Sequence, residues 1–113
     1  MVAEDYKEAE QEAVLHQKIY SHIWDYLAIP YIRVKKPEWE SFPGALGAIE
    51  DYTIMPTGKA MENGSINILG QAYAKAFDIT FKDGEGKTNH VWQVCTGNGG
   101  RYLAAVIATH GDD

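Results

Sequence analysis

Cysteine, long apolar runs and positive charge are all scarce in this 113-residue chain. The single cysteine, Cys95, excludes an intramolecular disulfide and fits a reducing compartment. The longest stretch without Asp, Glu, Lys or Arg runs from Thr88 to Gly100, which is shorter than the ~20 apolar residues of a membrane span. The acidic start, Met1 to Glu12, lacks the basic and apolar regions of a signal peptide. These absences predict a cytoplasmic protein that does not enter a membrane.

Positive charge is too sparse for a basic face. The formal net charge is −6, and the one local cluster of basic residues is Arg33, Lys35 and Lys36. A nucleic-acid binder needs a basic surface that displaces counterions from phosphates. The sequence therefore predicts no nucleic-acid partner.

Metal and cofactor motifs are also missing. The histidines do not have metal-ligand spacing, and there is no Walker loop, dinucleotide fingerprint or nucleophile elbow. The run Gly97-Asn98-Gly99-Gly100 is superficially similar to a phosphate loop, but it joins two predicted strands with no predicted helix after it. We therefore expect a hairpin at this run, and no metal or cofactor.

The first half of the chain has the pattern of one amphipathic helix. A chain of this length forms one domain, residues 1–113. Helical spacing predicts a helix over about residues 3–28, with a buried stripe of Tyr6, Ala9, Ala13, His16, Tyr20, Ile23 and Leu27. Pro30 ends it. An irregular link follows at 29–50, with a short edge strand at 31–36, a helical turn led by Pro37, and a segment at 44–49 that fits loop, helical turn or strand.

The second half, residues 51–110, predicts an antiparallel meander of four strands. Turn-rich loops at 62–65, 82–87 and 96–100 separate the apolar runs. Asn63-Gly64 is typical of a type I′ hairpin turn, which pairs Met61 with Ile66. Residues 71–77 are rich in alanine and fit a helix on propensity, but the flanking turn signals favour a strand. The last two strands are expected at 88–96 and 101–110.

Several of these runs resemble a known superfamily. The runs Phe77 to Lys87, His90 to Val94, Gly99 to Ala105 and Thr109-His110 are similar to the closing strands of the nuclear-transport-factor-like and ketosteroid-isomerase-like superfamily. The resemblance implies an α+β fold, the cystatin-like cone, in which an N-terminal amphipathic helix packs on a curved four- to five-stranded antiparallel meander. It also implies a pocket. No catalytic residue carries over, because the Tyr and Asp pattern of the isomerases does not align here.

A pocket between helix and sheet would be lined by aromatic residues and histidines. The candidate ligand-binding residues are His16, Tyr20, Trp24, Tyr52, Tyr73, His90, Trp92 and Tyr102. Ordinary packing explains the same residues, with His16 as a hydrogen-bonded core histidine and the others as helix or sheet packing. Glu50, Asp51, Asp25 and Asp78 would become proton shuttles if buried, or remain solvated ends of elements.

Three functions fit these observations. The first is binding of a small apolar or aromatic ligand between helix and sheet. The second is a cofactor-independent isomerase, cyclase or dehydratase with a buried carboxylate or histidine as general base. The third is a non-catalytic interaction module, a homodimer formed through a sheet face, because one helix cannot cover both apolar faces of a sheet. The sequence assigns no catalytic residue and leaves open whether the chain is an enzyme.

Overall fold

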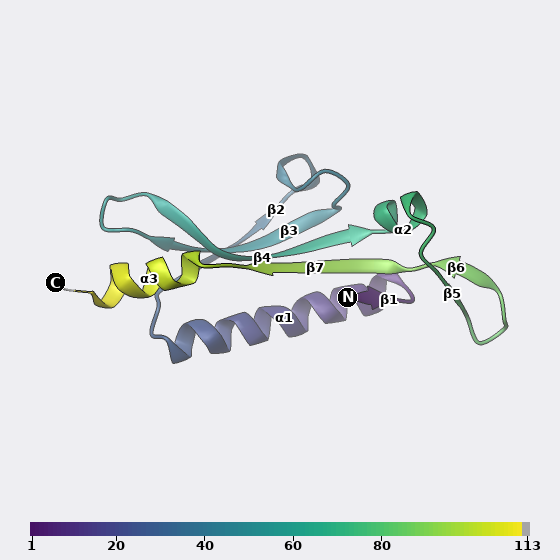
Figure 1. Cartoon of the computed structure of the whole chain (residues 1–113), viewed down its shortest axis with the longest axis horizontal. Helices are drawn as coiled ribbons and strands as arrows, with labels where there is room; N and C mark the ends of the chain where they lie inside the picture. The colour runs from purple at the N-terminus through teal and green to yellow at the C-terminus, as the bar shows by residue number, and fades with distance from the viewer. Residues whose placement is uncertain (112–113) are drawn as a thin grey trace.

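A five-stranded antiparallel sheet with the strand order β1-β7-β4-β3-β2 forms the body of the molecule, in a computed structural model that describes residues 1–111. The helices are α1 (Tyr6–Tyr26), α2 (Ala72–Ala76), α3 (Arg101–His110) and the 3₁₀ helix η1 (Glu38–Glu40). The strands are β1 (Val2–Ala3), β2 (Ile32–Lys36), β3 (Gly47–Ile54), β4 (Ala60–Gly70), β5 (Thr80–Lys82), β6 (Thr88–His90) and β7 (Trp92–Asn98). Figure 1 shows α1 beneath the sheet, α3 at one end and the β5–β6 hairpin at the other.

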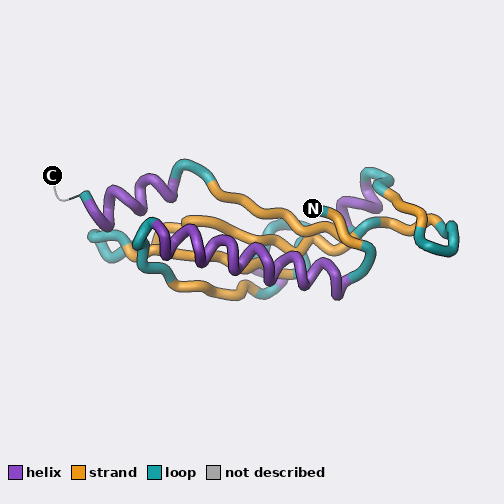
Figure 2. The backbone as a smooth tube through the Cα atoms, turned by 90° about the horizontal axis from the view of Figure 1, so that it is seen from below, coloured by secondary structure: helices purple, strands orange, loops and turns teal. Residues whose placement is uncertain are grey.

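Helix α1 supplies most of one layer and runs along the sheet (Figure 2). It begins after Asp5, whose carboxylate accepts a hydrogen bond from the Glu8 N–H at 2.8 Å. This N-cap satisfies one of the free N–H groups of the first turn. The helix ends at Tyr26 with Leu27 as its C-cap, after which Ala28 adopts a positive φ of 51° and Pro30 follows two residues later.

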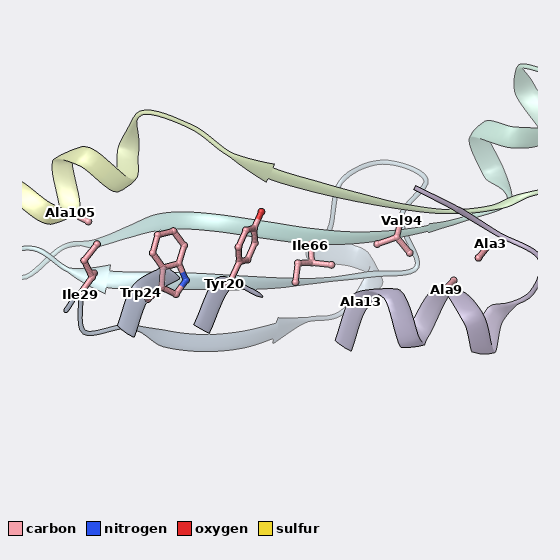
Figure 3. Close-up of a cluster of buried hydrophobic side chains, with 9 residues drawn as sticks. All are labelled: Ala3, Ala9, Ala13, Tyr20, Trp24, Ile29, Ile66, Val94 and Ala105. Atoms are coloured by element: carbon pink, nitrogen blue, oxygen red, sulfur yellow. The ribbon is translucent and has the colours of Figure 1, made fainter. Parts of the chain in front are cut away.

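The hydrophobic core lies between α1 and the sheet (Figure 3). Tyr20 and Trp24 of α1 pack with Ile66 of β4 and Val94 of β7, and Ala105 of α3 closes the cluster at one end. We call this side of the sheet the covered face. Alternation along the strands directs the intervening side chains to the other side, the open face.

The register of the sheet places open-face residues in rows. Glu50 of β3 pairs with Val34 on one side and with Ser65 of β4 on the other, and Ser65 pairs with Gly97 of β7. Residues directly opposite each other in antiparallel strands share a face. Glu50 and Ser65 are therefore neighbours on the open face.

The predicted cone and its four-strand meander are wrong. Residues 101–110 form a helix rather than a strand, and 72–76 adopt the helical alternative. Asn63 and Gly64 lie inside the continuous strand β4. The turn between β3 and β4 instead follows Met55, where Gly58 has a φ of 83° and donates its N–H to the Met55 carbonyl at 2.8 Å.

Other local predictions agree with the structure. Residues 6–26 are helical, 32–36 form an edge strand, and the predicted turn at 82–87 joins β5 to β6. The division of the chain into a single domain stays a prediction. No helix within residues 1–111 is both long enough and apolar enough to cross a membrane.

Candidate functional site

A hollow of about 420 Å³ lies where β7 leaves the sheet and leads into α3. Two segments line it: Glu62, Asn63, Gly64 and Ser65 of β4, and Gly97 to Arg101 at the junction. The two segments lie together because Gly64 pairs with Asn98, and Ser65 with Gly97. The hollow therefore joins residues more than thirty positions apart in the chain.

The amino end of α3 forms one wall of this hollow. Gly99 and Gly100 precede the helix. Gly100 is the N-cap residue and has no side chain that could accept a hydrogen bond from the first turn. The first turn of α3 contains no acidic residue. The Tyr102 and Leu103 N–H groups donate to the Gly99 and Gly100 carbonyls at 3.4 and 3.1 Å, so the positive potential at this end comes from the helix dipole. This wall is suited to an anion such as a phosphate group.

Arg101 adds a full positive charge at the same place. Its side chain is 69% exposed, and its Nη1 lies 3.9 Å from Glu62 Oε2 across the hollow. An exposed pair at this separation is weak and is screened by salt. The Arg101 guanidinium can therefore exchange Glu62 for an anionic ligand at little cost.

A second polar group adjoins the hollow on the open face. The Tyr52 hydroxyl donates to Glu50 Oε2, and Lys36 Nζ lies 2.9 Å from the same oxygen. Burial raises the pKa of Tyr52, and its hydrogen bond to Glu50 adds to this effect. The bond to Glu50 also raises the pKa of Lys36. Tyr52 pairs with Glu62 in the sheet, so this trio extends the site toward strand β2.

The combined site offers both signs of charge. Arg101 and the positive end of the α3 dipole attract an anion, while Glu50 and Glu62 accept hydrogen bonds from ammonium or hydroxyl groups. Within residues 1–111, no cluster of three His, Cys, Asp or Glu is placed to hold a metal ion. A zwitterionic or phosphorylated small molecule matches this arrangement better than the flat apolar ligand expected from the sequence.

Four of the predicted ligand residues come from helices α1 and α3 on the covered side of the sheet. His16 is half-buried, with Nδ1 2.9 Å from the Glu12 carbonyl. The Tyr20 hydroxyl donates to the Gly97 carbonyl at 3.1 Å, and burial raises the pKa of Tyr20. Trp24 is fully buried, and Tyr102 packs at the core edge. Tyr20 and Trp24 are adjacent, with ring centroids 5.8 Å apart.

The other four predicted residues are dispersed. Tyr52 lies on the open face, as described above. The Tyr73 hydroxyl donates to the Pro43 carbonyl at 2.7 Å. His90 Nε2 lies 3.4 Å from the Asp78 carboxylate. Trp92 packs edge-on against Tyr6, with the two ring centroids 5.7 Å apart. Ligand binding by the eight residues stays a prediction, and the structure does not gather them in one pocket.

Sequence reasoning missed the two segments that line the hollow. The expected hairpin at residues 97–100 is wrong, because a helix follows it. The available signal was a glycine run followed by Arg101 and an alanine-rich segment, which is typical of a loop leading into a helix. Of the two alternatives that the sequence left open for Asp51, the solvated strand end does not apply, because the residue is 1% exposed.

Comparisons with known proteins agree on one family. A family model described as the tRNA synthetase class II core domain (G, H, P, S and T) matches residues 2–110. The chain therefore belongs to the class II tRNA synthetase core domain family.

Within that family, the similar proteins are proline–tRNA ligases. The enzyme of Methanobrevibacter smithii is 44% identical over 107 residues, which are 95% of this chain and 23% of that protein. The enzyme of Aeropyrum pernix is 40% identical over 112 residues, 99% of this chain and 23% of that protein. The chain thus spans less than a quarter of these relatives.

Solved structures show the same likeness. Giardia lamblia prolyl-tRNA synthetase in complex with prolyl-adenylate superimposes with a TM-score of 0.93 at 25% identity, covering 98% of this chain and 23% of that chain. The Cryptosporidium parvum prolyl-tRNA synthetase complexed with L-proline and AMP superimposes with a TM-score of 0.89 at 30% identity. The match covers 98% of this chain and 24% of that chain.

These findings overturn several expectations. The resemblance to the nuclear-transport-factor-like superfamily is wrong, and so is the cone that it implied. The three functions expected from the sequence, namely binding of an apolar ligand, an isomerase-type reaction and a homodimeric interaction module, are also wrong. The chain belongs to a synthetase family instead. The exclusion of nucleic acid is also contradicted, because the relatives are tRNA ligases.

Proposed function

We propose that this chain forms part of the amino-acid activation site of a prolyl-tRNA synthetase, and that the hollow between β4 and α3 binds prolyl-adenylate. The observation that carries this proposal is the convergence of Glu62 to Ser65 with Gly97 to Arg101 at a helix amino end. The Giardia lamblia and Cryptosporidium parvum neighbours are described with prolyl-adenylate and with L-proline plus AMP. Those ligands contain an anionic phosphate and the ammonium group of proline, which match the positive and negative groups of the site.

The anionic part of the ligand suits the α3 side of the hollow. A phosphate oxygen at the amino end of α3 accepts hydrogen bonds from Arg101 and lies at the positive end of the helix dipole. Arg101 then leaves Glu62, from which it is separated by 3.9 Å. The guanidinium therefore binds and orients the phosphate without breaking a strong internal bond.

The cationic part suits the carboxylates on the β3–β4 side. Proline carries a secondary ammonium group, which pairs with a carboxylate in a partly desolvated site. Glu62 lines the hollow, and Glu50 lies beside it through its pairing with Ser65. Lys36 and Tyr52 hold Glu50 in place.

Transfer of proline to tRNA by a protein containing this chain is part of the same proposal. The named relatives act on tRNA, and the chain covers 23% of the first two. The formal net charge of this segment is −6, so the segment has no broad basic surface on which tRNA could bind. A cytoplasmic location belongs to the proposal as well.

Isothermal titration with prolyl sulfamoyl adenosine, a stable analogue of prolyl-adenylate, tests this function. The wild-type chain should bind the analogue, and Arg101→Ala should weaken binding about tenfold or more because a charge-assisted contact is lost. Lys82→Ala, an exposed cation on the distant strand β5, is the matched control and should leave affinity unchanged. Equal effects of the two substitutions, or no binding by the wild type, would contradict the proposal.

A further inference from the structure

Strand β4 contains a one-residue bulge at the edge of the candidate site. Tyr52 pairs with Glu62 and Asp51 pairs with Gly64, so Asn63 has no partner in the β3–β4 ladder. A bulge of this kind disrupts alternation and redirects the side chains on either side of it. Asn63 therefore controls which face of the sheet Glu62 occupies.

The bulge places Glu62 on the side of the ligand hollow. Gly64 lies on the covered face, where the Tyr20 ring is 3.2 Å from the position of an added Cβ. In a regular strand, residues two apart share a face, so Glu62 would also face α1. With the bulge, Glu62 shares the open face with Tyr52 and reaches Arg101.

A buried hydrogen-bond relay holds the bulge. Asn63 is 2% exposed, and its Nδ2 donates to Thr53 Oγ1 at 2.5 Å. The Thr53 hydroxyl donates in turn to the Pro30 carbonyl at 2.9 Å. A carbonyl can only accept, so the Thr53 hydrogen is committed to Pro30 and its lone pairs face Asn63.

This direction determines the orientation of the Asn63 amide. Only Nδ2 can donate to the Thr53 oxygen, and Oδ1 has no partner among the described residues. The relay links the segment after α1 to the strand that carries Glu62.

We propose that Asn63 and Thr53 are positioning residues of the activation site, which hold the β4 bulge so that Glu62 faces the ligand and Arg101. This inference rests on the proposed function, because Glu62 matters only if the hollow binds a charged ligand. Neither Asn63 nor Thr53 needs to touch the ligand. Their role is to select the face on which the Glu62 carboxylate lies.

Substitutions at Thr53 separate positioning from simple stabilisation. Thr53→Val keeps the shape and removes the hydroxyl, whereas Thr53→Ser keeps the hydroxyl. The valine variant should bind prolyl sulfamoyl adenosine about tenfold more weakly, since misplacing a contact group by ~1 Å has effects of this size or larger. The serine variant should retain wild-type affinity. If Thr53→Val does not fold, Asn63→Ala removes the donor while leaving the Thr53–Pro30 bond, and the same loss is expected.

Cross-strand NOEs in the unliganded chain provide the second readout. The wild type and Thr53→Ser should show main-chain contacts between Tyr52 and Glu62, while Thr53→Val should shift them toward Tyr52 and Asn63. A folded Thr53→Val variant that keeps both the NOEs and the affinity would overturn the inference. Failure of the wild type to bind would instead count against the proposed function, while the NOEs would still decide whether Thr53 holds the bulge.

Discussion

Arg33 and Asp51 form a two-pronged ion pair between helix α1 and the sheet. Arg33 Nε lies 2.7 Å from Asp51 Oδ1, and Arg33 Nη2 lies 2.8 Å from Oδ2. The Trp24 indole N–H donates to the same Oδ2 at 2.8 Å. The hydrogen bonds from the Arg33 guanidinium to the Asp51 carboxylate raise the pKa of Arg33. The pair joins the edge strand β2 to β3 and to the helix.

Replacing Arg33 with alanine should strongly destabilise the chain. Asp51 is 1% exposed, so the substitution leaves a buried carboxylate without its cation. Breaking such a pair typically costs ~3–5 kcal/mol. The free energy of unfolding from urea titrations measures the effect. Arg101→Ala is the matched control, because the exposed ion pair that it removes is worth less than about 1 kcal/mol. Equal losses in the two variants would refute the role of the Arg33–Asp51 pair.

Tyr20 should make stability depend on alkaline pH. Burial raises the pKa of Tyr20 above its ordinary value of 10.0, so the folded state retains the phenolic proton when the unfolded chain loses it. The resulting contribution to stability is fully present below about pH 10 and is lost as the pH rises through the folded-state pKa. Tyr20→Phe should flatten the decline in unfolding free energy above about pH 10, measured by urea titration at a series of pH values. An unchanged slope in the variant would contradict this prediction.

Gly70 should tolerate no side chain. Its φ is +60°, and an added Cβ would lie 3.0 Å from Leu46 Cδ1. Gly70→Ala therefore combines backbone strain with a steric contact, and we expect a loss of about 1–3 kcal/mol in unfolding free energy. Gly84→Ala, at a position with open space around it, should change stability by less than about 0.5 kcal/mol. Thermal and urea unfolding of both variants provide the comparison, and similar stability of the two would refute the constraint at Gly70.

Local periodicity predicted the parts of the fold in which one face is clearly apolar. Helix α1 was visible because its buried stripe alternates with charged residues. Helix α3 was not visible, since apolar residues occur on both of its sides: Ala105 is fully buried while Leu103 and Ile107 are 54% and 68% exposed. A short run that is apolar throughout fits strand and helix equally well.

The site was hidden for a different reason. Asn63-Gly64 has the composition of a hairpin turn, yet the pair lies within β4 because a bulge and a buried relay stabilise it there. Local turn chemistry cannot show that Thr53, whose hydroxyl donates to the Pro30 carbonyl, accepts a hydrogen bond from Asn63 Nδ2. Arg101 and Glu62 meet only through the pairing of β4 with β7. Those contacts require the tertiary structure.

A crystal structure of this chain with prolyl sulfamoyl adenosine tests the central claim most directly. The account predicts that the sulfamoyl group lies at the amino end of α3, with an oxygen ~3 Å from the Arg101 guanidinium. It also predicts the prolyl ammonium on the side of Glu62 and Glu50. Binding of the analogue instead in the groove of about 300 Å³ between α1 and strands β2 and β3, or an empty hollow at saturating analogue, would contradict the account.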